Sequence, residues 1–182
     1  YAKKLVAVPI AIAGQAVGQA SMPFFARLFA EGRRDELADT VLRTVRGASV
    51  LAIVFAAGLI ALANPVAGVL LVRGKFTVVD LDPTTGYLVV FAAAVPLWVL
   101  QGLLARAFYA AGNTWRPMLA GTVVTVVSLP IYAFAWHHHG ATGLALASGA
   151  GILLHTLSVA VLLPRLLPEL RGRNVIQRVG LR

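Results

Sequence analysis

The polar side chains of the first apolar stretch are the residues best suited to chemistry. Lys3 and Lys4 precede residues 5–26, which carry no formal charge but include Gln15 and Gln19. At about 100° per residue in an α-helix, Lys4, Gln15 and Gln19 fall on one face, and Lys3 points away from it. A cation and two amides on one face of an apolar helix are suited to binding an anion in a polar cavity.

Two interpretations of this face are open. Polar side chains inside a membrane can hydrogen-bond to neighbouring helices, which would make Gln15 and Gln19 structural contacts. Such groups also line water-filled cavities. In that case Lys4, Gln15 and Gln19 would bind a substrate, while Lys3 would reach to the membrane interface. Gly14, four residues before Gly18 in the sequence, has the G-x-x-x-G spacing that permits close helix approach.

The histidines are weaker candidates for a site. Residues 137–139 are three consecutive histidines, and three neighbours at a helix end cannot all face one metal ion. His155 is distant from them in the sequence, so we predict no metal site. We expect His155 to hydrogen-bond to a neighbouring helix, with Ser128 or Thr125 as its partner.

Nothing in the sequence indicates an enzyme or a cofactor. The chain has no cysteine, which excludes disulfides and thiolate metal sites. Five acidic residues fall in predicted loops without the spacing of a triad or carboxylate pair: Asp35, Glu36, Asp39, Asp80 and Asp82. Arg106 and Arg116 lie beside Tyr109 and Trp115, and we interpret this group as an aromatic and basic belt at a membrane interface.

Composition requires a membrane. The chain is 59% hydrophobic and 13% charged, with a mean hydropathy of +0.82, whereas soluble domains average roughly 45–50% apolar and about 25% charged residues. The net charge of +9 comes from basic residues at the ends of apolar tracts, which indicates membrane topology and no nucleic acid. The chain begins Tyr-Ala-Lys-Lys, and we interpret it as part of a longer multi-pass protein.

The elements that must position these residues are five apolar tracts. Each is long enough to cross a bilayer as a helix. We therefore predict an all-α integral membrane protein, a bundle of five transmembrane helices with a basic cytoplasmic tail or linker at 165–182. The predicted helices cover about 3–29, 38–72, 83–111, 114–138 and 141–164.

Local signals refine these helices. Pro9, Pro96 and Pro130 predict kinks. Thr40 is a candidate N-cap for the second helix, after a short interfacial helix in EGRRDELAD. Residues 112–114, Gly-Asn-Thr, predict a turn and an N-cap.

Charge counting gives an orientation. With five alternating spans, four of the 16 Lys and Arg residues fall on one side, and the other 12 fall on the opposite side. The four are Lys3, Lys4, Arg73 and Lys75. Because cytoplasmic loops are rich in Lys and Arg, we expect the side with 12 to be cytoplasmic.

Four segments of the chain carry a resemblance to a known family: YAKKLVAVPIAIAGQAVGQASMPFFARLFAEG, LLVRGKF, ARAFYAAGNTWRPM and GATGLALASG. With these segments the chain resembles the MurJ/MviN-type lipid II flippases of the MATE-like transporter superfamily. The resemblance covers residues 1–164, in the order of the eighth to twelfth of that family's fourteen helices.

This resemblance implies a function. It implies a flippase that moves an undecaprenyl-diphosphate-linked peptidoglycan precursor, lipid II, across the bacterial cytoplasmic membrane by alternating access between two lobes. The implied partners are that lipid-linked glycan, membrane lipids and an N-terminal lobe of the same chain. Two alternatives are open: export of another lipid-linked oligosaccharide or MATE-like transport, and a non-transporting scaffold that binds lipid precursors.

The resemblance also implies a site. Lys4 takes the place of the family's cavity-facing arginine, Lys3 that of an aspartate, and Ala7 that of a later acid. A lysine is a point charge without the two-pronged geometry of arginine, and the exchange of both acids makes the cavity rim more positive. Lys4 would then face the substrate, and Gln15 and Gln19 would continue the cavity wall.

Overall fold

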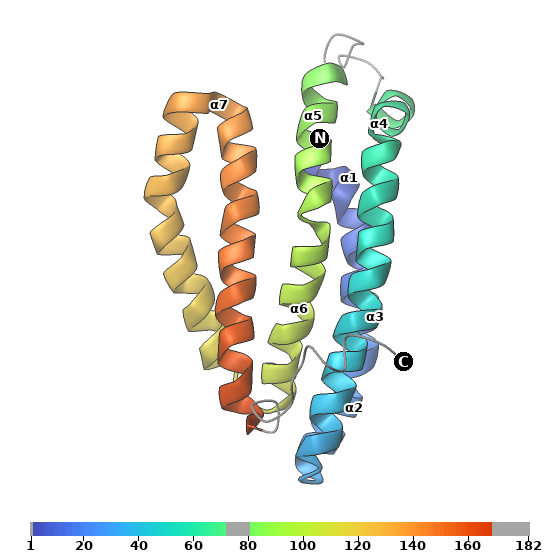
Figure 1. Ribbon diagram of the computed structural model, residues 1–182, viewed down its shortest axis with the longest axis vertical. Helices are drawn as coiled ribbons and strands as arrows, with labels where there is room; N and C mark the ends of the chain where they lie inside the picture. The colour runs from blue at the N-terminus through green and yellow to red at the C-terminus, as the bar shows by residue number, and fades with distance from the viewer. Residues whose placement is uncertain (1, 72–80, 169–182) are drawn as a thin grey trace.

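Long helices run side by side between two ends of the molecule (Figure 1). The computed structural model describes residues 2–71 and 81–168. One end, named here the Gly32 end, contains the turn at Gly32 and the turn at Gly112. The other, the Gly140 end, contains the start of the first helix and the bend at Gly140.

The first span is one continuous helix with an irregular centre. It comprises α1 (Ala2–Pro9), η1 (Ile10–Ala16) and α2 (Val17–Ala30), of which η1 is a π-helix. The predicted kink at Pro9 falls where the π-helix begins. Proline has no N–H to donate, so the α-helical hydrogen-bond ladder is already interrupted there.

The turn after α2 is held by charged side chains. Arg27 Nε lies 2.7 Å from Glu31 Oε1, and Arg33 Nη1 lies 2.8 Å from Glu31 Oε2. Hydrogen bonds from Arg27 and then Arg33 lower the pKa of the Glu31 carboxyl. Gly32 supplies the positive φ of 71° that the reversal requires.

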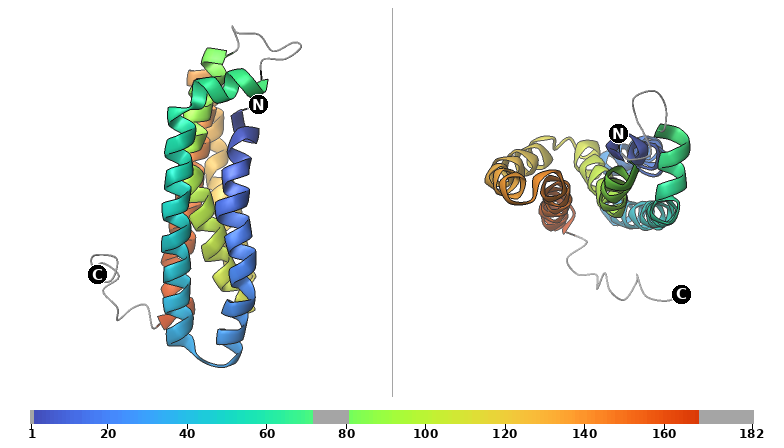
Figure 2. Two further views of the ribbon diagram at one scale, coloured as in Figure 1. Left: turned by 90° about the vertical axis from the view of Figure 1, so that its right-hand side faces the viewer. Right: turned by 90° about the horizontal axis from the view of Figure 1, so that it is seen from above.

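The next two spans are each broken once. The second consists of α3 (Arg34–Ala61) and α4 (Ala63–Leu71), and the third of α5 (Leu81–Ala93) and α6 (Val95–Ala110). The α4 helix turns aside and lies across the Gly140 end (Figure 2).

Two of the local predictions for these spans can be compared with the helices. Pro96 occupies the first turn of α6, so the predicted kink is confirmed as a break near Ala94. The predicted cap at Thr40 is wrong. The α3 helix begins at Arg34, and the Thr40 hydroxyl donates to the Glu36 carbonyl inside it.

The last helical element is a hairpin. The α7 helix (Trp115–Leu166) contains non-helical backbone at Gly140, where φ is 55° and ψ is −138°, and two arms meet there (Figure 1). The first arm is 115–139 and the second arm 141–166. Thr114 is the N-cap of the first arm and its side chain forms no capping hydrogen bond, but the Asn113 side-chain oxygen accepts one from the Arg116 N–H at 3.3 Å.

Four of the described helices are long and apolar enough to cross a membrane, and α7 supplies two crossings. The predicted bundle of five membrane helices is therefore confirmed. Arg73 and Lys75 of the charge count and residues 169–182 of the predicted tail lie outside the described residues.

Alanine-rich packing brings the helices together. One apolar cluster joins α1, α3 and α5, and a second joins α2, α3, α6 and the second arm of α7. In the end-on view, α5 and α6 separate the two arms of α7 from the remaining helices (Figure 2). Many large apolar side chains on the first arm are exposed, as a lipid-facing surface requires.

We predict that Gly140→Ala destabilises the full-length protein by about 1–3 kcal/mol, because only glycine adopts this backbone conformation without strain. Gly58→Ala in α3 is the matched control, since its φ is ordinary and nothing lies within 4 Å of the added Cβ. The control should be neutral or slightly stabilising. Thermal unfolding in detergent measures both, and an equal midpoint for the two variants would contradict the strained bend.

Candidate functional site

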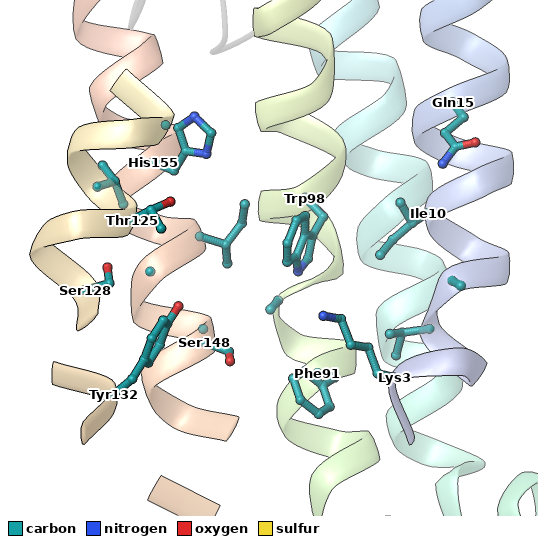
Figure 3. A pocket seen from close by; sticks show the side chains of 18 residues that line it. Lys3, Ile10, Gln15, Phe91, Trp98, Thr125, Ser128, Tyr132, Ser148 and His155 are labelled. Atoms are coloured by element: carbon teal, nitrogen blue, oxygen red, sulfur yellow. The ribbon is translucent and has the colours of Figure 1, made fainter. Parts of the chain in front are cut away.

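A cavity of about 390 Å³ lies between α1–η1, the α5–α6 helix and the two arms of α7. Figure 3 shows Lys3 and Gln15 on one side and residues of both α7 arms on the other. Phe91 and Trp98 line it from α5 and α6. The cavity is mostly apolar, with a few polar groups that converge on it, which is the composition of a small-molecule site.

Lys3 is the cation of this cavity. The Lys3 side chain extends from α1 toward α5 and α6 (Figure 3). Both lysines and both glutamines are exposed, but Lys4 and Gln19 are not among the residues that line this cavity. The lining of this cavity therefore contains Lys3 in the place predicted for Lys4. Whether Lys4, Gln15 and Gln19 contact a substrate stays a prediction.

The π-helix explains why Gln15 shares a helix face with Lys3 and not with Lys4. A π-helix closes its hydrogen bonds five residues apart, so each residue turns the chain by about 80°, against about 100° in an α-helix. Over the five steps from Ile10 to Gln15 the missing rotation adds up to about 100°, which is the rotation of one residue in an α-helix. Gln15 is thereby rotated from the face of Lys4 onto the face of Lys3.

The α7 side of the cavity carries polar atoms without partners. Ser128 Oγ and His155 Nε2 are buried and have no hydrogen-bond partner among the described residues. The expected hydrogen bond of His155 to Ser128 or Thr125 is therefore not formed by Nε2. The Thr156 hydroxyl, on the same arm, has two carbonyl acceptors, Ile152 of its own helix at 2.7 Å and Leu97 of α6 at 3.2 Å.

A second cavity of about 350 Å³ adjoins the first. It shares Ile10, Gln15 and Trp98 with the first and extends toward the Gly32 end, where Arg106 and Tyr109 line it. Sequence reasoning assigned Arg106 to an interfacial belt. The structure instead directs its guanidinium inward, with Nη1 3.2 Å from the Gly14 carbonyl oxygen.

The glycine pair makes room for this arginine. A Cβ at Gly18 would overlap the Arg106 guanidinium, and a Cβ at Gly14 would lie 3.3 Å from Val99 Cγ2. The G-x-x-x-G spacing therefore permits the close approach that it predicts. This spacing could have indicated an inward-pointing Arg106, because two glycines on one helix leave space for a large side chain from another helix.

The two cavities together provide positive charge and hydrogen-bond donors. Lys3, Gln15 and Arg106 line them, and no Asp or Glu of the described residues does so. Cations with amide donors and no competing carboxylate favour an anionic ligand. The arrangement holds no nucleophile–base pair within the described part of the chain and is suited to binding.

Comparison with known families agrees with this chemistry. The family model described as "Lipid II flippase MurJ" matches residues 1–178. A probable lipid II flippase MurJ of Vibrio cholerae is 28% identical over 156 residues, which cover 85% of this chain and 30% of that protein. One of Bdellovibrio bacteriovorus is 26% identical over 182 residues, covering 100% of this chain and 35% of that protein.

A solved structure has the same arrangement of helices. It is described as "Lipid II flippase MurJ, inward closed conformation", and it matches with a TM-score of 0.78 at 19% identity. The match covers 88% of this chain and 34% of the other. The chain thus spans about a third of the length of the relatives it matches.

Proposed function

Because this chain belongs to the family of the lipid II flippase MurJ, we propose that it acts as part of a flippase for lipid II. The full-length protein would carry the undecaprenyl-diphosphate-linked peptidoglycan precursor across the bacterial cytoplasmic membrane. The observation that carries this proposal is a cationic cavity free of acids among its described lining residues, inside a bundle of membrane helices.

The chemistry of the cavity suits such a substrate. A diphosphate requires positive charge and N–H donors, which Lys3 and Gln15 offer. The apolar wall formed by Ile10, Phe91 and Trp98 suits the parts of a lipid that adjoin the headgroup. Lysine binds phosphate as a point charge, so the contact tolerates movement of the headgroup during transport.

We propose Lys3 and Gln15 as the first substrate contacts in this part of the protein. Lys4 and Gln19 are further candidates, since both are exposed on the same span and could meet a headgroup from outside the described cavity. This assignment is supported by the lining of the cavity for Lys3 and Gln15, and by exposure on the same span alone for Lys4 and Gln19.

The proposal includes a multi-pass position in the cytoplasmic membrane, with the Gly32 end toward the cytoplasm. Arginines concentrate at the Gly32 end, including Arg27, Arg33, Arg116 and Arg165, whereas Lys3 and Lys4 lie at the other. This asymmetry supports the orientation through the preference of Lys and Arg for cytoplasmic loops.

The test uses the full-length protein in two assays. It should restore growth to a bacterium depleted of its own lipid II flippase, and in proteoliposomes it should move lipid II between leaflets. Growth without lipid II movement would indicate a scaffold. Movement of another polyprenyl-linked oligosaccharide but not lipid II would indicate a different exporter, and either result would overturn the proposed substrate.

A further inference from the structure

Arg106 is a half-buried charged side chain that points into the helix bundle. It belongs to the membrane span Leu81–Ala110, and its guanidinium reaches Gly14, near the middle of the span Ala2–Ala30. A charge inside a membrane protein is costly unless it faces a water-filled cavity or a partner. Arg106 lines the second cavity, so the cavity supplies its polar environment.

Most N–H donors of the Arg106 guanidinium are available to bind a ligand. Its one hydrogen bond to the described residues is to the Gly14 carbonyl, and no carboxylate of the described chain forms an ion pair with it. An arginine carries five N–H donors, so most of them are available. Gln101 and Tyr109 line the same cavity and add further hydrogen-bonding groups.

Gln15 joins this arginine to the cation of the first cavity. Gln15 lines both cavities, with Lys3 in the first and Arg106 in the second. Lys3 lies near the start of α1 at the Gly140 end, and Arg106 lies in the last turns of α6, toward the Gly32 end. An anion that moves between the two cavities would therefore pass from one cation to the other by way of the Gln15 amide.

We propose that Arg106, with Gln15, forms a second binding site for the diphosphate of a lipid headgroup, nearer the Gly32 end than Lys3. This deepens the proposed function and rests on it for the identity of the lipid. Arginine binds phosphate oxygens through two parallel hydrogen bonds, whereas Lys3 offers a single charge. The two cations would thus hold the headgroup at successive positions, Lys3 in the first cavity and Arg106 in the second.

A purely structural role for Arg106 predicts different behaviour. If its task were only to satisfy the Gly14 carbonyl, glutamine could donate to that oxygen and ligand binding would not change. The binding proposal requires the positive charge and the fork geometry. Arg106→Gln and Arg106→Lys separate these roles, because the first removes the charge and the second keeps it without the fork.

The experiment measures binding to the full-length protein in nanodiscs of neutral lipid. The three ligands are undecaprenyl diphosphate, inorganic diphosphate and phosphatidylglycerol. Arg106→Gln should weaken binding of both diphosphates about tenfold, the loss expected for a charge-assisted hydrogen bond. Arg106→Lys should lose less. Arg116→Gln is the control, since Arg116 is exposed at the Gly32 end and lies outside both cavities.

The outcomes separate this site from the proposed function. Unchanged diphosphate binding by Arg106→Gln, or a loss confined to phosphatidylglycerol, would overturn the site even if the wild-type protein transports lipid II. Arginine-dependent diphosphate binding without lipid II transport would keep the site and overturn the function. Should Arg106→Gln fail to fold, Gly18→Ala displaces the guanidinium while keeping its charge, and it should weaken diphosphate binding as well.

Discussion

Lys3→Ala in the full-length protein is expected to lower lipid II transport about tenfold or more. Lys3 is the cation that lines the first cavity, and no carboxylate of the described residues lines that cavity with it. Removing a charge-assisted hydrogen bond costs about 1.5–3 kcal/mol, which corresponds to roughly a tenfold to hundredfold loss. Lipid II movement in proteoliposomes measures the effect, and Lys3→Arg should retain most of the activity because it keeps the charge.

Lys4→Ala is the matched comparison for this prediction. Lys4 is the next residue on the same helix and carries the same charge, but it does not line the cavity. Its loss should lower transport less than the loss of Lys3 does. A large loss for Lys4→Ala with none for Lys3→Ala would restore the assignment made from helical spacing and contradict the cavity seen in the structure.

The five membrane spans could be predicted from the sequence because their signals are local. Long apolar tracts separated by Gly32, Gly112 and Gly140 fix where helices begin and turn, and the structure has helices in these tracts. The end of the interfacial segment was less predictable. Ion pairs of Arg33 with Glu31 and Glu36 hold the start of α3, so the helix begins before Thr40.

Which of Lys3 and Lys4 shares a helix face with Gln15 could not be predicted, because the answer depends on the rotation per residue between them. A constant 100° step places Gln15 with Lys4, and the π-helix places it with Lys3. Pro9 predicts a kink, but neither its identity nor its position predicts that the helix continues after it with π-helical hydrogen bonds.

Arg106 and His155 show a second limit of the sequence. The contact of Arg106 with Gly14 joins residues far apart in the chain, and its inward direction depends on the notch at Gly18. Local composition placed it with Tyr109 in an interfacial belt. Likewise, His155 lines the first cavity and its Nε2 has no hydrogen-bond partner among the described residues, although spacing alone predicted a hydroxyl partner.

The π-helix leads to a prediction about deletions. A π-helical turn is equivalent to one extra residue in an α-helix, so deleting one residue within Ile10–Ala16 should convert η1 to an α-helix. Lys3 and Gln15 are twelve residues apart in the chain and would then be eleven apart, which at about 100° per residue leaves them about 20° apart on one face. Deletion of Ala11, which is exposed, is therefore expected to leave the full-length protein folded and active.

Deletion of Ala20 is the matched control, and its effect should be large. Ala20 is also an exposed alanine, but it lies in α2, where no residue is surplus. Its removal rotates the rest of α2 by about 100°, which turns Phe25 out of the core cluster that it shares with Phe108. Losing such a buried aromatic costs about 3–5 kcal/mol, so folded protein should not accumulate. Thermal unfolding and growth rescue measure both deletions, and equal damage from the two would mean that η1 contains no surplus residue and that the pairing of Lys3 with Gln15 has another cause.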